Sequence, residues 1–236
     1  MPSDDTPEAE GDLTEQFMAL AAHDLRNPIA VMKASAQMAQ RQMRRGDLGA
    51  AEGRLSAIVD QSDRLTEMLE TFVDAARLSA GGLPLRRETV DLREVVEMAQ
   101  ARTRVLVGDQ IERDVEVSIP EGCVGGWDRA RLARAVRALL ANALLYGDQD
   151  APVRVHAQRN GRRVVVRISG GGPGPDTDEQ AHLFERFFRG RSAAEAGQSG
   201  SGLGLYTARG IAREHGGDLQ HVTGDTFEIE LPLLAE

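Results

Sequence analysis

The stretch FMALAAHDLRNPIAVMKASAQM, residues 17–38, carries the strongest pattern in the chain. Its apolar residues recur about every three to five positions, which predicts an amphipathic helix with one face to bury. These residues are Phe17, Leu20, Leu25, Ile29 and Met32. Asp24 follows His23 directly, and Pro28 comes about one turn later. A proline inside a helix removes a backbone hydrogen bond at a cost of roughly 3 kcal/mol, so we expect Pro28 to kink the helix.

His23 can act as a nucleophile if a neighbouring carboxylate forms a hydrogen bond with one nitrogen of its ring. A carboxylate within reach of one ring nitrogen fixes the tautomer and leaves the other nitrogen free to attack. Asp24 can supply that carboxylate. The alternative is a core histidine without a chemical role, since an imidazole titrates near neutrality in any setting. The helix alone leaves both interpretations open.

The composition of the 236-residue chain predicts one large or two modest domains with an aliphatic core, because 41% of the residues are hydrophobic and only 4% aromatic. The net charge is −9, and residues 1–12 hold five acids and no base, so we expect a disordered acidic tail there. No basic domain is present, which argues against a nucleic-acid partner. No apolar run reaches about 18 residues and no signal peptide is visible, so we expect no membrane segment in this chain and a cytoplasmic location.

Residues 13–80 are expected to form a long helical hairpin. The first helix runs from about Asp12 to Arg45, and RRGDLGA at 44–50 interrupts it. The second helix runs to about Ser79, and its stripe alternates steps of three and four residues, the seam of a coiled coil or bundle. The stripe consists of Leu55, Ile58, Ser62, Leu65, Leu69, Phe72 and Ala76. A hairpin buries only one seam, so we expect a homodimer whose two hairpins form a four-helix bundle.

Residues 81–88 are interpreted as a linker, because AGGLPLRR at 80–87 holds two glycines and a proline. Residues 89–236 mix helical and alternating patterns, so the fold class is α+β, with a second domain of helices and strands. Helices are expected at about 91–105, after Asp128, at 178–188 and at 202–215, and strands at 115–119, 153–157, 164–168, 219–222 and 226–231. Asn160-Gly161 predicts a type I′ hairpin turn between two of these strands.

Two glycine-rich segments of this second domain are candidate phosphate-binding loops. SGGGPGP at 169–175 follows a strand, and GSGLGL at 200–205 opens a helix. Glycines before a helix let backbone N–H groups approach phosphate oxygens, and the helix dipole adds attraction. Ordinary turns are the alternative for either segment alone. Residues 189–201 are small and polar, which suggests a mobile loop.

Asn142 and the segment LFERFFRG at 183–190 supply further candidate side chains. The carboxamide oxygen of Asn142 can ligate Mg²⁺, which prefers oxygen ligands and often bridges substrate phosphates. A hydrogen bond to a neighbouring loop is the alternative for this asparagine. The phenylalanines of LFERFFRG are expected to anchor a core or a lid, and Arg186 or Arg189 can steady a transferring phosphoryl group. The other histidines are expected to be structural or exposed, namely His156, His182, His215 and His221.

The order of these segments resembles the transmitter region of sensor histidine kinases over residues 13–232. The resemblance implies a dimerisation and phospho-acceptor hairpin followed by an ATP-binding α/β sandwich of the gyrase-like (Bergerat) type. HDLRNP matches the phospho-acceptor box, so His23 is implied to be the phosphorylated histidine and Asp24 its assisting acid. Asn27 falls on the polar position linked to dephosphorylating a response regulator.

The same resemblance implies ATP and Mg²⁺ as cofactors, with Asn142 as the magnesium-binding asparagine. The positions implied to bind the nucleotide are Asn142, Tyr146, Gly172, Gly174, Phe184, Arg186, Arg189, Gly202, Leu203 and Gly204.

Three positions depart from the family pattern. The first glycine segment of the family normally opens with an aspartate that reads the adenine amino group, and Gly170 stands there instead. Losing that charged acceptor costs about 1.5–3 kcal/mol, roughly ten- to a hundredfold in affinity. Asp176 and Asp178 lie past the loop and are not expected to substitute for it. Ala138 replaces a second asparagine of the helix, and Leu145 replaces a lysine or arginine that meets phosphate.

The resemblance implies a protein-histidine kinase that passes the γ-phosphoryl group of Mg-ATP to His23 and then to the receiver domain of a response regulator. The departures leave an alternative open, a degenerate, ATP-impaired member that acts as a phosphotransfer relay or a dimeric docking scaffold. A gyrase- or mismatch-repair-type ATPase shares the ATP fold but does not account for the HDLRNP hairpin. No sensor domain precedes the hairpin, so the input is expected from the short tail, a missing segment or a partner protein.

Overall fold

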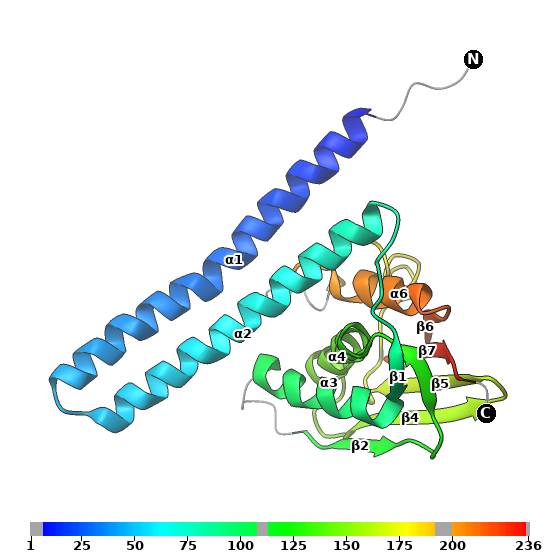
Figure 1. Cartoon of the computed structure of the whole chain (residues 1–236). Coiled ribbons are helices and arrows are strands. Elements are labelled where there is room, and N and C mark those ends of the chain that lie inside the picture. Colours follow the sequence, from blue (N-terminus) through cyan, green and yellow to red (C-terminus); the bar gives the residue numbers. More distant parts are fainter. Residues whose placement is uncertain (1–6, 108–112, 192–199, 235–236) are drawn as a thin grey trace. The chain divides into compact units, whose positions relative to one another are not determined.

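The computed structural model describes residues 7–107, 113–191 and 200–234, without the side chains of residues 7–23 and 104–107. The chain divides into two compact units (Figure 1). The first comprises Met1–Phe72 with Ser199–Ser201, and the second comprises Val73–Gln198 with Gly202–Glu236. Helices dominate the first unit and a sheet with covering helices forms the second, which confirms the predicted α+β class.

Two long helices, α1 (Pro7–Arg44) and α2 (Leu48–Ser79), form the predicted hairpin. α1 begins at Pro7 rather than at the expected Asp12, so the helix extends into the acidic segment that we expected to be disordered. A proline is tolerated in the first turn because its N–H would have no helical partner there. α1 also continues through Pro28, so the hydrogen bond lost at this proline does not end the helix.

Gly46 ends α1 and allows the chain to reverse. Its φ is +78°, and its N–H donates to the Met43 carbonyl at 3.1 Å, while the Asp47 N–H donates to the Gln42 carbonyl at 3.0 Å. This pair of bonds is the Schellman arrangement, which needs a left-handed residue that glycine supplies without strain. The Asp47 side chain then caps α2, since it accepts the Ala50 N–H at 3.1 Å.

The predicted seam of α2 is only partly buried in this chain. Phe72 is buried and Ile58 and Leu65 are half-buried, whereas Leu55 and Leu69 are 50% and 46% exposed. Further large apolar side chains of the hairpin are exposed, namely Ile29, Val31, Met38, Met43, Leu48, Val59 and Val73. The hairpin therefore presents a second apolar line that it does not cover itself.

The second unit contains a five-stranded sheet with strand order β2-β4-β5-β7-β6. β2 pairs with β4 in parallel, and the other neighbours are antiparallel. The strands are β2 (Val115–Ser118), β4 (Val153–Asn160), β5 (Arg163–Ser169), β6 (Asp218–Thr223) and β7 (Thr226–Pro232). The helices α3 (Leu92–Val107), α4 (Arg129–Tyr146) and α6 (Gly204–Glu214) lie on one face of this sheet (Figure 1).

The core lies between α4 and the sheet. Along β4 and β5 every second side chain is buried, as the alternating pattern predicts, and α4 presents its apolar stripe to them. The buried residues include Leu132, Val136, Leu139, Leu140, Val153, Val155, Val164, Val166, Ile168, Ile229 and Leu231. Two predicted helix starts are confirmed, because Asp91 accepts the Arg93 N–H at 2.8 Å and Asp128 accepts the Arg131 N–H at 3.1 Å.

Two local predictions for the second unit are wrong. Residues 178–188 form successive turns rather than a helix, with bonds such as Glu185 N–H to the His182 carbonyl, and Phe187 adopts a φ of +67°. The β4–β5 turn has Gly161 and Arg162 at its centre, because Asn160 pairs with Arg163. Gly161 has a positive φ and Arg162 does not, which is the type II′ pattern rather than type I′.

A small second sheet was missed by the sequence pattern. β1 (Glu88–Asp91) pairs with β3 (Val124–Trp127) in the antiparallel sense. Each strand has four residues, and β3 contains two glycines, so neither shows a usable alternation. The expected mobile loop at 189–201 lies mostly in residues 192–199, outside the described residues.

The last turns of α2 belong to the second unit and are joined to α4 through Asp74. The Asp74 side chain is only 4% exposed, and it accepts from Arg134 Nη2 at 2.5 Å, with Arg131 Nε at 3.8 Å. Leu78 packs on Gly210 of α6, where an added Cβ would lie 2.3 Å from Leu78 Cδ1. A buried carboxylate shared by two arginines fixes the helix end, because separation would leave its charge unpaired.

His215 is a buried neutral residue of the second unit, in agreement with its expected structural role. It is 0% exposed, its Nδ1 donates to the Ile211 carbonyl at 2.7 Å and its Nε2 accepts the Asp128 N–H at 2.9 Å. Burial lowers the pKa of this imidazole, against the opposing effect of the Ile211 hydrogen bond. Protonation would also remove the acceptor that Asp128 needs.

We expect the second unit to lose stability as the pH falls below about 6.5, the pKa of an unfolded histidine. The unfolded state then binds a proton that folded His215 does not, which contributes a slope of at most about 1.4 kcal/mol per pH unit. Trp127 is the only tryptophan and is 0% exposed, so its fluorescence follows unfolding of this unit. Denaturation at pH 7.5 and 5.5 should show a smaller pH dependence for His215→Gln than for the wild type, and equal slopes would contradict this assignment.

Candidate functional site

The carboxyl-terminal half of α4 carries the candidate magnesium ligand. Ala138, Asn142 and Tyr146 are spaced four residues apart, so they follow one another along the same face of the helix. Asn142 is half-buried and Tyr146 is 40% exposed. The side chains of Asn142 and Tyr146 are therefore accessible to a ligand that binds against this face of the helix.

The first glycine segment lies against the end of α4. A Cβ at Gly172 would be 2.9 Å from both the Tyr146 carbonyl oxygen and Gly147 Cα, and a Cβ at Gly147 would be 2.8 Å from Gly170 Cα. On its other side, a Cβ at Gly174 would lie 1.6 Å from the Gly224 carbonyl oxygen. The glycines thus let one loop pass between the end of α4 and the β6–β7 turn.

Arg113 holds this arrangement together, although no sequence motif indicated its role. Its guanidinium donates to the carbonyls of Ala143 at 2.7 Å, Ala151 at 2.7 Å and Gly170 at 2.6 Å. The Gly170 carbonyl also accepts the Asp148 N–H at 3.0 Å. The planar fork of an arginine suits several carbonyls at once, so one side chain fixes the end of α4 and the loop after β5.

The second glycine segment lies at the opposite end of this face of α4. A Cβ at Gly204 would be 3.9 Å from the Ala138 Cβ. Gly202 has a φ of +67°, its carbonyl accepts the Phe187 N–H at 3.1 Å, and an added Cβ would lie 2.5 Å from the Phe187 carbonyl carbon. Leu203 between them is fully buried. Asn142 therefore lies on α4 between the positions that the two glycine segments approach.

Phe184 and Arg186, two candidates from LFERFFRG, lie in different surroundings. Phe184 packs edge-on against Phe227 with ring centroids 6.3 Å apart, and Arg209 lies 4.7 Å above its ring. Arg186 donates to Ser79 Oγ at 3.0 Å, at the end of α2. The contacts found for Phe184 and Arg186 are therefore structural.

Arg189 is the arginine of this segment whose charge affects a residue of α4, namely Tyr146. Burial raises the pKa of Tyr146, and the positive charge of Arg189 opposes that shift. The two side chains thus lie close enough to interact electrostatically. Of the two arginines considered for a phosphoryl group, Arg189 is the one whose charge reaches the Asn142–Tyr146 face.

The three candidate catalytic residues of the hairpin all lie in α1. The side chain of His23 lies outside the described residues, Asp24 is half-buried and Asn27 is exposed. Asn27 follows His23 by four residues, so the two positions share a helix face.

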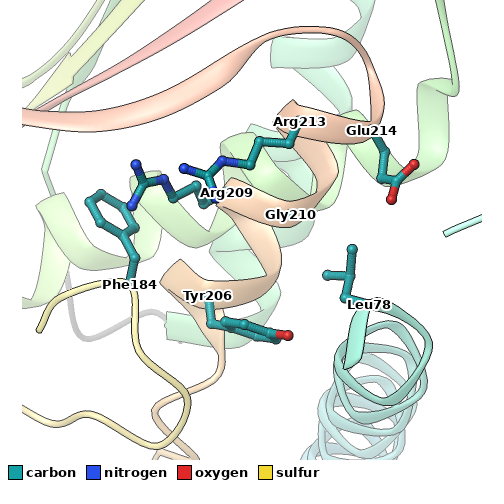
Figure 2. A pocket seen from close by; sticks show the side chains of 7 residues that line it. All are labelled: Leu78, Phe184, Tyr206, Arg209, Gly210, Arg213 and Glu214. Atoms are coloured by element: carbon teal, nitrogen blue, oxygen red, sulfur yellow. The ribbon is translucent and has the colours of Figure 1, made fainter. Parts of the chain in front are cut away.

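A separate groove of about 250 Å³ lies along α6 (Figure 2). Its lining consists of Leu78, Phe184, Tyr206, Arg209, Gly210, Arg213 and Glu214. Arg209 and Arg213 both bind Asp218; burial of this carboxyl raises its pKa, but the two arginines outweigh this and lower it to about 2. Except for Phe184, none of the candidate nucleotide-binding residues lines this groove, which is therefore distinct from the Asn142 site.

The described residues hold no group of three or more His, Cys, Asp or Glu side chains that could bind a metal ion. A magnesium ion at Asn142 would therefore rely on one carboxamide oxygen and on oxygens of its substrate, a pattern that Mg²⁺ commonly adopts. Among the described helices, none is both long and apolar enough to cross a bilayer.

Two family models match the chain in the order that the motifs predict. The His Kinase A (phospho-acceptor) domain matches residues 13–81, and the histidine kinase-, DNA gyrase B- and HSP90-like ATPase matches residues 127–235. The solved structure of the mycobacterial sensor histidine kinase MprB is 30% identical in sequence to this chain. The match covers 97% of that structure and 62% of this chain, with a TM-score of 0.50. The chain belongs to the sensor histidine kinase family.

Other members of the sensor histidine kinase family extend the similarity to most of the chain. The sensor-like histidine kinase SenX3 of Mycobacterium tuberculosis is 28% identical over 225 residues, which is 93% of this chain and 54% of that protein. The chain thus spans about half the length of the curated relatives it matches. The histidine kinase AdeS of Acinetobacter baumannii, 22% identical with a TM-score of 0.61 over 90% of this chain, has the same fold.

The contact between Gly174 and Gly224 can be tested by comparing two alanine variants. Gly174→Ala forces a Cβ against a backbone carbonyl at a φ of +78°, whereas Gly161→Ala meets a similar φ of +59° with nothing within 4 Å. The left-handed conformation alone costs about 1–2 kcal/mol in either variant. We expect Gly174→Ala to lower the free energy of unfolding, followed by Trp127 fluorescence, by at least about 1 kcal/mol more than Gly161→Ala. Equal losses would show that the loop and turn are not in tight contact.

Proposed function

We propose that this chain is a protein-histidine kinase module that phosphorylates His23 from Mg-ATP. The observation that supports this most strongly is the position of Asn142 on α4, between the approaches of the Gly172–Gly174 loop and the Gly202–Gly204 segment. Glycines let backbone N–H groups approach phosphate oxygens, and the amino end of α6 at Gly204 adds its positive dipole. Asn142 would hold Mg²⁺, which neutralises charge on the phosphates.

The proposed reaction transfers a phosphoryl group to nitrogen. His23 Nε2 attacks the γ-phosphorus, a P–N bond forms, and the bond from that phosphorus to the β,γ-bridging oxygen breaks, so ADP leaves. Asp24 would accept the hydrogen bond of Nδ1–H, which keeps Nε2 unprotonated and stabilises the positive charge that develops on the ring. Positioning and charge neutralisation supply most of the rate in such transfers.

The phosphohistidine would then pass its phosphoryl group to an aspartate in the receiver domain of a response regulator. Asn27 lies on the same helix face as His23 and is exposed, so it can orient a water molecule for the opposing dephosphorylation of that regulator.

We also propose that the hairpin dimerises into a four-helix bundle. Leu55 and Leu69 lie 14 residues apart on the seam of α2 and are half exposed, while Ile58, Leu65 and Phe72 between and beyond them are half-buried or buried. One line of the seam therefore packs inside the hairpin and the other faces outward. A second hairpin is the partner whose geometry fits a heptad line.

Charge placed on the outward line should separate the dimer. Leu55→Arg combined with Leu69→Arg would bury two cations without partners at the bundle seam, so we expect a monomer by analytical ultracentrifugation at concentrations where the wild type is a dimer. Asp60→Arg combined with Asp63→Arg serves as a control at two exposed positions of the same helix outside the predicted seam and should stay dimeric. A double-leucine variant that sediments as the wild type would reject this interface.

Incubation with γ-labelled ATP and Mg²⁺ tests the proposed function directly. We expect acid-labile, base-stable label on the wild type and none on His23→Gln, because only the histidine offers the attacking nitrogen. His182→Gln, at an exposed histidine, is the control and should label normally. Label that survives in His23→Gln would reject His23 as the acceptor. A folded dimer without label would instead support the relay or scaffold alternative, in which a phosphorylated regulator charges His23 in reverse.

A further inference from the structure

Position 170 raises the question of how this chain would recognise adenine. The resemblance to sensor histidine kinases places an adenine-reading aspartate there, and Gly170 has no side chain to replace it. Gly170 is buried, and its carbonyl is held by Arg113 and by the Asp148 N–H. The backbone at this position is therefore fixed, and an acceptor for adenine must come from another residue.

Asp225 places a carboxylate beside the missing side chain. Its Oδ2 accepts the Gly170 N–H at 2.7 Å, and it lies 2.9 Å from the point that a Cβ at position 170 would occupy. An aspartate carries its carboxylate oxygens two bonds beyond Cβ. The carboxylate of Asp225 thus occupies the space into which an aspartate at position 170 would extend.

The β6–β7 turn holds Asp225 in this position. Gly224 has a φ of +54°, and its carbonyl oxygen is 2.7 Å from His221 Nε2, within hydrogen-bond distance. The same turn is pressed against Gly174 of the first glycine segment. Two contacts therefore link the turn to the loop that faces α4, one between Asp225 and the Gly170 N–H and one between Gly224 and Gly174, and both limit the movement of the Asp225 carboxylate.

The Asp225 carboxylate retains capacity to bind a ligand. Asp225 is only 9% exposed, and among the described residues Gly170 is the hydrogen-bond donor found for its carboxylate. An ionised carboxylate offers about four lone-pair sites on two oxygens. A carboxylate with a single protein donor can accept further hydrogen bonds, and a ligand N–H group is a fitting second donor.

We propose that Asp225 supplies, from the β6–β7 turn, the carboxylate that accepts the 6-amino group of adenine. This inference rests on the proposed function, since it concerns the same ATP site. It also predicts a preference for adenine, because a 6-oxo purine would present a carbonyl oxygen where the 6-amino group donates. Two acceptors facing each other in a buried site cannot form a hydrogen bond, so such a nucleotide loses the contact.

The test compares ATP with inosine triphosphate, which differs from ATP by a 6-oxo group, on the full chain in the presence of Mg²⁺. Calorimetric titration should show that the wild type binds ATP at least about tenfold more tightly than inosine triphosphate. Asp225→Asn keeps an oxygen for the Gly170 N–H but loses the second acceptor. We expect it to weaken ATP binding roughly ten- to a hundredfold and to change inosine triphosphate binding little, so that the preference for adenine disappears.

Two controls separate a reading role from a structural role. Glu97→Gln makes the same charge change at an exposed position of α3 and should leave both affinities unchanged. Denaturant unfolding followed by Trp127 fluorescence should give the same free energy of unfolding for Asp225→Asn as for the wild type. If Asp225→Asn leaves ATP binding unchanged, or weakens both nucleotides equally, Asp225 does not read adenine although the ATP site stands. If the wild type binds neither nucleotide, the proposed kinase function fails, and this inference fails with it.

Discussion

The hydrogen bonds of Arg113 are the constraint on which the candidate site depends. One guanidinium satisfies carbonyls at the end of α4, in the segment before β4 and in the loop after β5. Each of these carbonyls lies where regular structure ends, so the backbone cannot satisfy all of them itself. A shift of the loop relative to α4 would break several charge-assisted bonds at once, and this couples the position of the first glycine segment to the helix that carries Asn142.

Close backbone contact is the second constraint, and it explains why small residues cluster around Asn142. The Gly172 and Gly147 positions approach each other at distances that no Cβ tolerates, and Gly174 does the same with Gly224. At the other end, Gly202 contacts the backbone of Phe187. These contacts place the first glycine segment against the end of α4 and the second against Ala138, with the β6–β7 turn and Phe187 packed on the two segments. Backbone groups can therefore line a phosphate site that has few charged side chains.

Helices and strands that bury one continuous face could be predicted from the sequence. Short strands, isolated turns and individual side-chain contacts could not. α4, β4 and β5 were recognisable because each has a continuous buried face that imposes a period on its residues. β1 and β3 are too short to show a period, and residues 178–188 satisfy a helical pattern while their hydrogen bonds form isolated turns. Arg113 was not predicted, because in a sequence a loop arginine looks the same whether it is solvated or binds four carbonyls.

The long hairpin shows a different limit, because its pattern predicts more contacts than one chain provides. The seam of α2 has the period of a bundle, yet only one of its two lines is covered within the chain. Sequence periodicity reports the burial that a helix reaches in its final assembly. For this reason the pattern can indicate a bundle although one chain covers only one of the two lines.

The absence of an aspartate at position 170 and the presence of Asp225 in the β6–β7 turn are best understood together. A side chain at position 170 would place its Cβ 2.3 Å from the Ala143 carbonyl oxygen and 2.9 Å from Asp225 Oδ2, so this backbone excludes it. Two buried carboxylates at that distance would also repel each other and could not both ionise without a large cost. Asp225 lies in the turn between β6 and β7, which is its local role. Only the contact of the turn with the loop after β5 shows that the same residue places an acid beside Gly170, where the family pattern has an aspartate.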